Sequence, residues 1–375
     1  MPHKPGQSRN LWRLLLGCLL CCSNLSQAQA QSLQPGFQLN EYLEMLRITA
    51  MQVDTPHRHK LPPPQDFKRQ FRSPEYALDN NWELWTNASQ QTMVVSIRGT
   101  TGKSVSWLEN FYAAMIPAKG SLQLNDSTTF RYTLAADPKA TVHIGWTLGL
   151  ATMAPDILST IRKQYHAHQT RQLIIMGHSQ GGALSFLLRS YLYYLQQAGE
   201  LPADLRIKTY CSAAPKPGNL YYGYDYDHIT RNGWSFTVVN ALDWVPETPF
   251  SLQTLKDFNT LNPFTDVTKS FRNQSWIVRM YLNSVYNKMN RRSRKAQETF
   301  SKQLGRNLSR QVKKALPQFQ PPAYANNMNY MRAGVPIVLM PDPSYFRQWP
   351  DSGTSVFRHH GLVPYYTLAQ AIYGE

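Results

Sequence analysis

The pentapeptide Gly177–Gly181 (GHSQG) constrains the fold of this 375-residue chain more than any other feature. It follows the apolar run 173–176 and precedes the segment 182–195, whose apolar residues recur at helical spacing. A G-x-S-x-G between a strand and a helix is typical of a tight, strained turn that lifts the serine hydroxyl above the helix N-terminus. The glycines leave room for the strand and the helix to cross closely. The pattern therefore predicts that Ser179 stands in the open at the end of a buried strand.

Short apolar runs alternate with helical patterns on both sides of this turn. The expected strands are a hairpin of 82–85 and 92–97, then 173–176, 207–213, 236–240 and 335–340, and the expected helices are 146–168, 182–195 and 362–373. Buried strands separated by helices are typical of a mostly parallel sheet with helices on both faces. The predicted fold class is therefore α/β. The mean hydropathy of −0.44 excludes a polytopic membrane protein.

The first thirty residues have the pattern of an export signal. A basic stretch with no acid precedes the short apolar run Leu14–Cys22, and the segment ends in Ala28-Gln29-Ala30. We therefore expect 1–30 to be a signal peptide cleaved near Ala30, and the protein to be exported, either secreted or periplasmic. A lipoprotein signal ending at Cys18 is the alternative, but it leaves too few apolar residues before the cysteine. Cleavage near Ala30 would remove the other three cysteines, so Cys211 would remain without a disulfide partner.

The remaining chain divides into a core and two flanking segments. Residues 31–75 form an N-terminal lead-in, 76–250 and 332–375 the α/β core, and 251–331 a helical, basic insertion within it. Residues 269–314 contain thirteen Lys and Arg against one acid, Glu298, and they hold most of the net charge of the chain. Two interpretations stay open: a cap with solvated charges, or peripheral contact with an anionic membrane surface. Nucleic acid is disfavoured by the export signal and by the lack of a recognisable binding module.

A serine nucleophile needs a base and an acid, which follow it along the chain in the order Ser, acid, His. Among the ten histidines, only His359 and His360 follow a late strand. Asp243 comes soon after the strand that ends at Asn240, and Asp342 follows another strand and is the alternative acid. The residue order therefore predicts a Ser-His-Asp triad built on Ser179.

Several separate stretches resemble the class 3 lipases of the α/β-hydrolase superfamily. The matching stretches are 94–100 (VVSIRGT), 107–110 (WLEN), 142–146 (VHIGW), 214–219 (APKPGN) and 239–246 (VNALDWVP). Ser106 stands where the family has Asp. The resemblance implies an α/β-hydrolase-type sheet, hydrolysis of carboxylic esters of lipids, and no metal or organic cofactor. It also implies that the apolar stretch 102–117 covers the site, although packing on the sheet explains its side chains equally well.

Carried over to this sequence, the family's motifs imply a role for each site residue. Ser179 would be the nucleophile and Asp243 the acid, with Thr100 and Gln180 as oxyanion-hole donors. The family's last histidine commonly precedes a tyrosine by five positions, which favours His360 over His359 because Tyr365 follows His360 at that spacing.

The sequence leaves the exact function open among three hypotheses. The first is a triacylglycerol lipase or a phospholipase A-type enzyme. The second is an esterase of non-lipid substrates, and the third is a catalytically inactive protein that binds anionic surfaces on a hydrolase scaffold. The intact order of nucleophile, acid and base argues against the third.

Overall fold

The computed structural model describes residues 32–52, 60–259, 261–262, 275–352 and 354–374. The chain divides into two compact units, Met1–Gln34 and Pro35–Glu375, and the account below concerns the second. The expected signal peptide, residues 1–30, lies outside the described residues. None of the described helices combines the length and the apolar character needed to cross a membrane.

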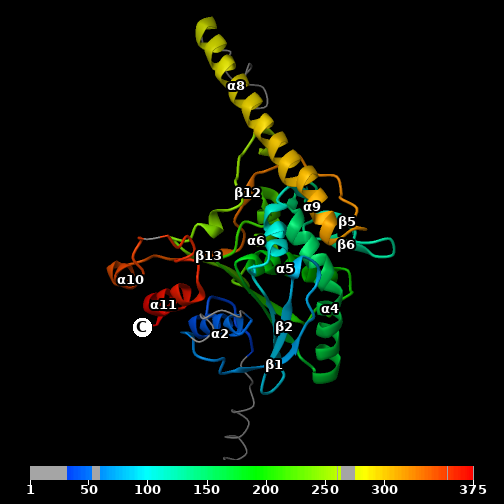
Figure 1. Ribbon diagram of the computed structural model, residues 1–375, viewed down its shortest axis with the longest axis vertical. Helices are drawn as coiled ribbons and strands as arrows, with labels where there is room; N and C mark the ends of the chain where they lie inside the picture. Colours follow the sequence, from blue (N-terminus) through cyan, green and yellow to red (C-terminus); the bar gives the residue numbers. More distant parts are fainter. Residues whose placement is uncertain (1–31, 53–59, 260, 263–274, 353, 375) are drawn as a thin grey trace, which may run out of the picture. The chain divides into compact units, whose positions relative to one another are not determined.

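A seven-stranded sheet forms the centre of the fold (Figure 1). Its strand order is β1 (Phe67–Arg72), β2 (Trp82–Asn87), β3 (Thr92–Ile97), β8 (Gln172–His178), β9 (Arg206–Ser212), β11 (Ser235–Asn240) and β13 (Val335–Leu339). From β3 to β13 neighbouring strands are parallel, whereas β1, β2 and β3 pair antiparallel. The α/β-hydrolase-type fold and the predicted hairpin are confirmed.

Helices cover both faces of this sheet. The helices α4 (Ile144–His168) and α5 (Gln180–Gln197) contribute to the main hydrophobic core, together with Val95 and Ile97 of β3. Ser96, between these two residues, instead bonds to Gln52 just after α2 (Leu39–Ala50). Because successive residues of a strand point to opposite faces, α2 covers the face opposite α4 and α5. The last helix, α11 (Leu362–Tyr373), packs against α2.

Smaller elements connect these layers. A four-stranded sheet has the order β12 (Tyr330–Met331), β10 (Gly218–Asn219), β7 (Thr141–His143) and β4 (Met115–Pro117), and β5 (Lys119–Gln123) pairs with β6 (Thr129–Thr133). The other helices are α3 (Ser104–Phe111), α6 (Leu220–Ile229), α10 (Pro343–Gln348) and the short 3₁₀ turns Ala77–Asp79, Val245–Glu247 and Leu255–Asp257. The sequence did not predict β1 or these two smaller sheets.

The basic insertion is helical, as its spacing predicts. It consists of α8 (Trp276–Ser301), a π-helical turn (Lys302–Asn307) and α9 (Leu308–Ala315). The sequence shows no convincing strand between residues 251 and 331, but the end of this segment forms β12, which pairs with β10. That strand is only two residues long, too short to give a pattern in the sequence.

Candidate active site

Ser179 lies on the strained turn that the sequence predicts, between β8 and α5. Its backbone is left-handed in φ, at φ 61° and ψ −130°, and its N–H donates to the carbonyl of Ser212 at 2.9 Å. The flanking glycines are required by space. A Cβ on Gly177 would lie 2.1 Å from the backbone of Gly181, and a Cβ on Gly181 would lie 2.2 Å from the carbonyl oxygen of Ile97. Strand β8, helix α5 and strand β3 therefore approach one another closely beneath Ser179.

Asp243 and His360 form a hydrogen-bonded pair. His360 Nδ1 lies 2.7 Å from Asp243 Oδ2, which also accepts from the Tyr365 hydroxyl at 2.7 Å. The other carboxylate oxygen accepts from the Val245 N–H at 3.0 Å. Burial alone would raise the pKa of Asp243, but these bonds outweigh burial and hold the pKa below its ordinary value. The carboxyl is thus ionised and fixed in position beside the imidazole.

The pair lies next to the serine turn. His178, the residue before Ser179, donates from Nε2 to the carbonyl oxygen of His360 at 2.7 Å, and the two histidine rings lie 5.0 Å apart. Burial lowers the pKa of His178 to about 3, so this ring is neutral and serves as a fixed support. Among the described residues, no hydrogen bond joins the Ser179 hydroxyl to His360. Such bonds are often long in an unliganded enzyme and tighten when substrate binds.

Neither of the alternative residues contacts this cluster. His359 bonds through Nδ1 to the Tyr345 hydroxyl at 2.9 Å, and its Nε2 lies 3.8 Å from Asp351. Asp342 accepts from the Tyr345 N–H at 2.8 Å as the N-cap of α10. Because both residues bond to Tyr345 of α10, the geometry favours His360 over His359 and Asp243 over Asp342.

Thr100 and Gln180 lie together beside Ser179, as the resemblance implies. The Thr100 hydroxyl donates to Gln180 Oε1 at 2.8 Å, and the Asn110 amide donates to the same oxygen at 3.1 Å and to Thr100 Oγ1 at 2.9 Å. Trp146 fixes Asn110 through a bond from its indole N–H at 2.9 Å. The backbone N–H of Gln180 is the first of α5, where N–H groups have no acceptor within the helix.

Glu109 is a buried acid beneath this network, and the sequence analysis missed it. It lies on α3 and is fully buried, with Oε2 accepting from the Asn80 amide at 2.5 Å and Oε1 without a partner. Burial raises its pKa to about 8, so the carboxyl is mostly protonated at neutral pH. A Cβ on Gly149 of α4 would come within 2.4 Å of Oε1, so the helices pack tightly around it.

Aromatic rings form a rim beside His360. Phe357 lies 5.8 Å from the His360 ring, 5.9 Å from Trp107 of α3 and 5.3 Å from Trp244. The Trp244 indole N–H donates to the carbonyl of Val356 at 2.7 Å, which ties the acid loop to the loop before the histidine. Phe111 of α3 is 57% exposed. This rim is apolar and open to solvent, and nothing in the sequence indicated that Phe357 belongs to it.

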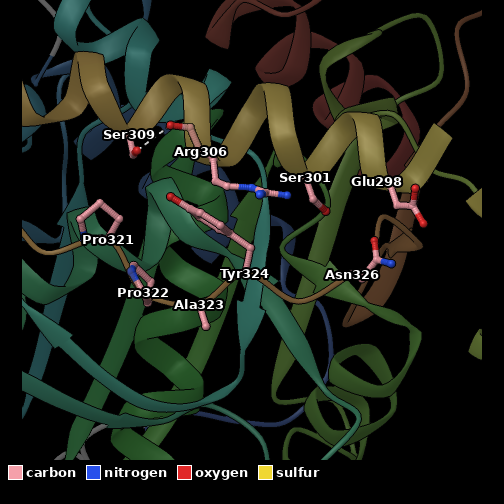
Figure 2. A pocket seen from close by; sticks show the side chains of 9 residues that line it. All are labelled: Glu298, Ser301, Arg306, Ser309, Pro321, Pro322, Ala323, Tyr324 and Asn326. Carbon is pink, nitrogen blue, oxygen red and sulfur yellow. Dashed lines mark hydrogen bonds between the residues drawn. The ribbon is translucent and has the colours of Figure 1, made fainter. Parts of the chain in front are cut away.

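A separate hollow of about 480 Å³ lies within the basic insertion, between its helical part 298–309 and the segment 321–326 (Figure 2). Figure 2 shows the Arg306 side chain alongside Tyr324, with Glu298 at one end. Ser309 bonds to the Arg306 carbonyl at 2.8 Å. The residues that line this hollow include none of the triad candidates.

Comparison with known proteins shows that part of the chain is similar to a known family. Residues 94–253 match the family model "Lipase (class 3)". This segment of the chain is similar to the class 3 lipases. Thr100, Ser179 and Asp243 lie inside the matched range, whereas His360 lies beyond it.

Several solved lipases resemble this chain distantly. The Rhizomucor miehei lipase propeptide complex is 19% identical with a TM-score of 0.39, and the match covers 58% of this chain and 64% of that one. A triacylglycerol lipase from Penicillium expansum is 16% identical with a TM-score of 0.40, covering 56% and 71%. A lipase from Rhizopus microsporus var. chinensis is 23% identical with a TM-score of 0.38, covering 57% and 69%. The first match spans less than two thirds of its partner's length. A comparison with curated proteins returns no match.

Proposed function

We propose that this enzyme hydrolyses carboxylic esters of lipids through a triad of Ser179, His360 and Asp243. The main support is the 2.7 Å contact between His360 Nδ1 and Asp243 Oδ2, formed next to the strained serine turn. That bond leaves Nε2 of the ring free to take a proton from the serine, and the ionised Asp243 favours the resulting imidazolium.

In this mechanism His360 accepts the Ser179 proton as the serine oxygen attacks the ester carbonyl. The backbone N–H groups of Thr100 and Gln180 stabilise the oxyanion, and each such donor contributes roughly 10²–10³ in rate. His360 then passes the proton to the leaving alcohol, which leaves an acyl-enzyme. A water molecule, deprotonated by His360, attacks that ester, and collapse of the second oxyanion releases the fatty acid and restores Ser179.

Lipid esters are favoured over small soluble esters by the surroundings of the base. Phe357, Trp107 and Trp244 offer an apolar rim beside His360, which suits an acyl chain better than a polar substrate. We also propose that the enzyme is exported, because residues 1–30 have the pattern of a cleaved signal.

The test compares Ser179→Ala, His360→Ala and His359→Ala, produced from residue 31 onward. His359→Ala is the matched control, since it removes the neighbouring ring that contacts Tyr345 instead of Asp243. Fatty-acid release is measured from a short-chain soluble ester, emulsified triacylglycerol, and phospholipid vesicles. We expect release to vanish in the first two variants and to persist in the third, with the lipid substrates preferred.

Two outcomes would contradict the proposal. Loss of activity in His359→Ala but not in His360→Ala would reassign the base. Absence of release from all substrates, together with a wild-type serine that does not react with a phosphonate probe, would favour the inactive, surface-binding protein.

A further inference from the structure

The basic insertion consists of two parts that differ in burial. In its C-terminal part, Phe300 and Val312 are buried, and Leu304, Leu308 and Leu316 pack against the hydrophobic clusters of the fold. This part is a structural cap, as one of the two interpretations from the sequence expected. The N-terminal half of α8 is different, because it has no buried residue before Gln297.

Large apolar side chains are exposed at the start of α8. Trp276 is 68% exposed, Ile277 57%, Met280 60% and Tyr281 68%. These four residues are called here the apolar tip. They lie on one side of the helix, because each residue of an α-helix is turned by about 100° from the one before, which places all four within roughly 140° of arc. Exposed apolar patches of this kind mark interaction surfaces. Nothing in the described part of the chain covers them.

A group of basic side chains follows on α8. Lys288, Arg291, Arg292, Arg294 and Lys295, called here the basic collar, are all exposed. The collar lies about 20 Å along the helix from the tip, by the rise per residue of an α-helix, and most of it shares the side of the tip. No ion pair between described residues involves a collar side chain. The collar is therefore a concentrated positive charge available to an anionic partner.

We propose that α8 docks the enzyme on an anionic lipid surface, with the apolar tip in the interface and the basic collar at the headgroup phosphates. Tryptophan and tyrosine favour the boundary between headgroups and acyl chains because each has an apolar body and a polar end. Basic residues are attracted to anionic headgroups, and each one near such a surface contributes about 1 kcal/mol. The tip is at the N-terminal end of α8 and the collar lies closer to the rest of the fold. This order matches a bilayer, in which the apolar layer lies beneath the charged headgroups.

Other partners fit these features less well. In a parallel pairing with a second copy of the chain, the two collars would lie side by side and repel each other. A soluble acidic protein would satisfy the collar but leaves the exposed apolar surface of the tip unexplained. A groove at the base of α8 adds support, because Arg292 and Lys295 line it together with the apolar Phe250, Phe300 and Leu304. An acyl chain with an anionic group at one end has matching chemistry.

The experiment measures vesicle flotation of the protein from residue 31 onward with Ser179→Ala, so that hydrolysis does not alter the vesicles. Vesicles of phosphatidylcholine alone are compared with vesicles containing about 30 mol% phosphatidylglycerol, at about 50 and about 500 mM salt. We expect binding only to the anionic vesicles, with strong weakening at high salt. Because binding is scored without catalysis, failure of docking and failure of the proposed triad are distinguishable.

Variants separate the two parts of the surface. Arg291→Gln with Arg294→Gln and Lys295→Gln should weaken the partition coefficient roughly 100-fold, at about fivefold for each charge. Trp276→Ser with Tyr281→Ser should weaken it roughly tenfold or more. The matched control, Lys68→Gln with Arg131→Gln and Lys163→Gln, removes three exposed charges elsewhere and should leave binding within about twofold.

Three results would overturn the proposal. They are equal binding to neutral and anionic vesicles, equal loss in the control and collar variants, or full binding by the tip variant. The collar and tip changes made with Ser179 intact should retain hydrolysis of a soluble ester, which excludes misfolding as the cause of lost binding. A concentration-dependent dimer that the tip variant abolishes, without vesicle binding, would assign the surface to a second copy.

Discussion

Replacing Glu109 by glutamine should remove a pH dependence from the stability of the protein. Burial raises the pKa of Glu109 from 4.5 to about 8. Below the pKa that Glu109 has in the unfolded protein, its carboxyl is neutral in both the folded and the unfolded state, so folding buries no charge. As pH rises towards 8, the unfolded state ionises while the folded state does not, so the free energy of unfolding falls.

The size of this effect follows from the shift in pKa. Each pKa unit corresponds to about 1.36 kcal/mol, so the fall between about pH 5 and about pH 8 is roughly 4 kcal/mol. Glutamine has nearly the shape of the protonated acid and cannot ionise. Glu109→Gln should therefore resemble the wild type near pH 5 and exceed its stability by a few kcal/mol near pH 8.

Urea unfolding followed by tryptophan fluorescence, repeated across this pH range, measures the difference. His143 and His178, whose pKa values burial lowers to about 3, give the wild type a pH dependence of opposite sign. Their contribution cancels in the comparison because both proteins retain them. The control is Glu298→Gln, which removes one carboxyl that is exposed on α8. Parallel stability curves for Glu109→Gln and wild type would refute a neutral, buried Glu109.

Two further substitutions test the serine turn and the acid. Asp243→Asn should lower kcat on a soluble ester by about 10⁴, with little change in KM, because the amide no longer fixes the imidazole tautomer; an unchanged kcat would exclude Asp243 as the acid. Gly177→Ala should lower the free energy of unfolding by about 2–4 kcal/mol and reduce activity, because its Cβ would lie 2.1 Å from the backbone of Gly181. Chemical denaturation that detects no change would show that the turn can relax.

The central part of the fold could be predicted because its signals are local. Strand β8, helix α5 and the glycines between them occupy consecutive residues, so apolar spacing and steric demand are visible together in the sequence. Strand β1 gave no such signal. Its sequence, FKRQFR, is exposed at five of six positions, and it joins the sheet at an edge through backbone bonds to β2. Backbone pairing leaves no pattern in the side chains.

Glu109 could not be predicted for a different reason. In the sequence it is a single acid in an apolar stretch, which is compatible with an exposed position on an amphipathic helix. Its burial depends on Asn80, which donates to it, and on Gly149, which allows α4 to approach. These residues come from two other parts of the chain, so only the tertiary structure brings them together.

The sequence by itself determined the strained turn at Ser179 and the chain order of Ser179, Asp243 and His360, because glycine sterics and chain order need no distant contact. The spacing to Tyr365 already favoured His360 over His359, but only the tertiary structure shows the contact with Asp243. There the His360 ring lies against Asp243 and the His359 ring against Tyr345. The tertiary structure likewise decided which part of the insertion is buried. Helical spacing is the same for a buried face and an exposed one, and the packing of the core buries Phe300 and Val312 but leaves Trp276 and Tyr281 in solvent.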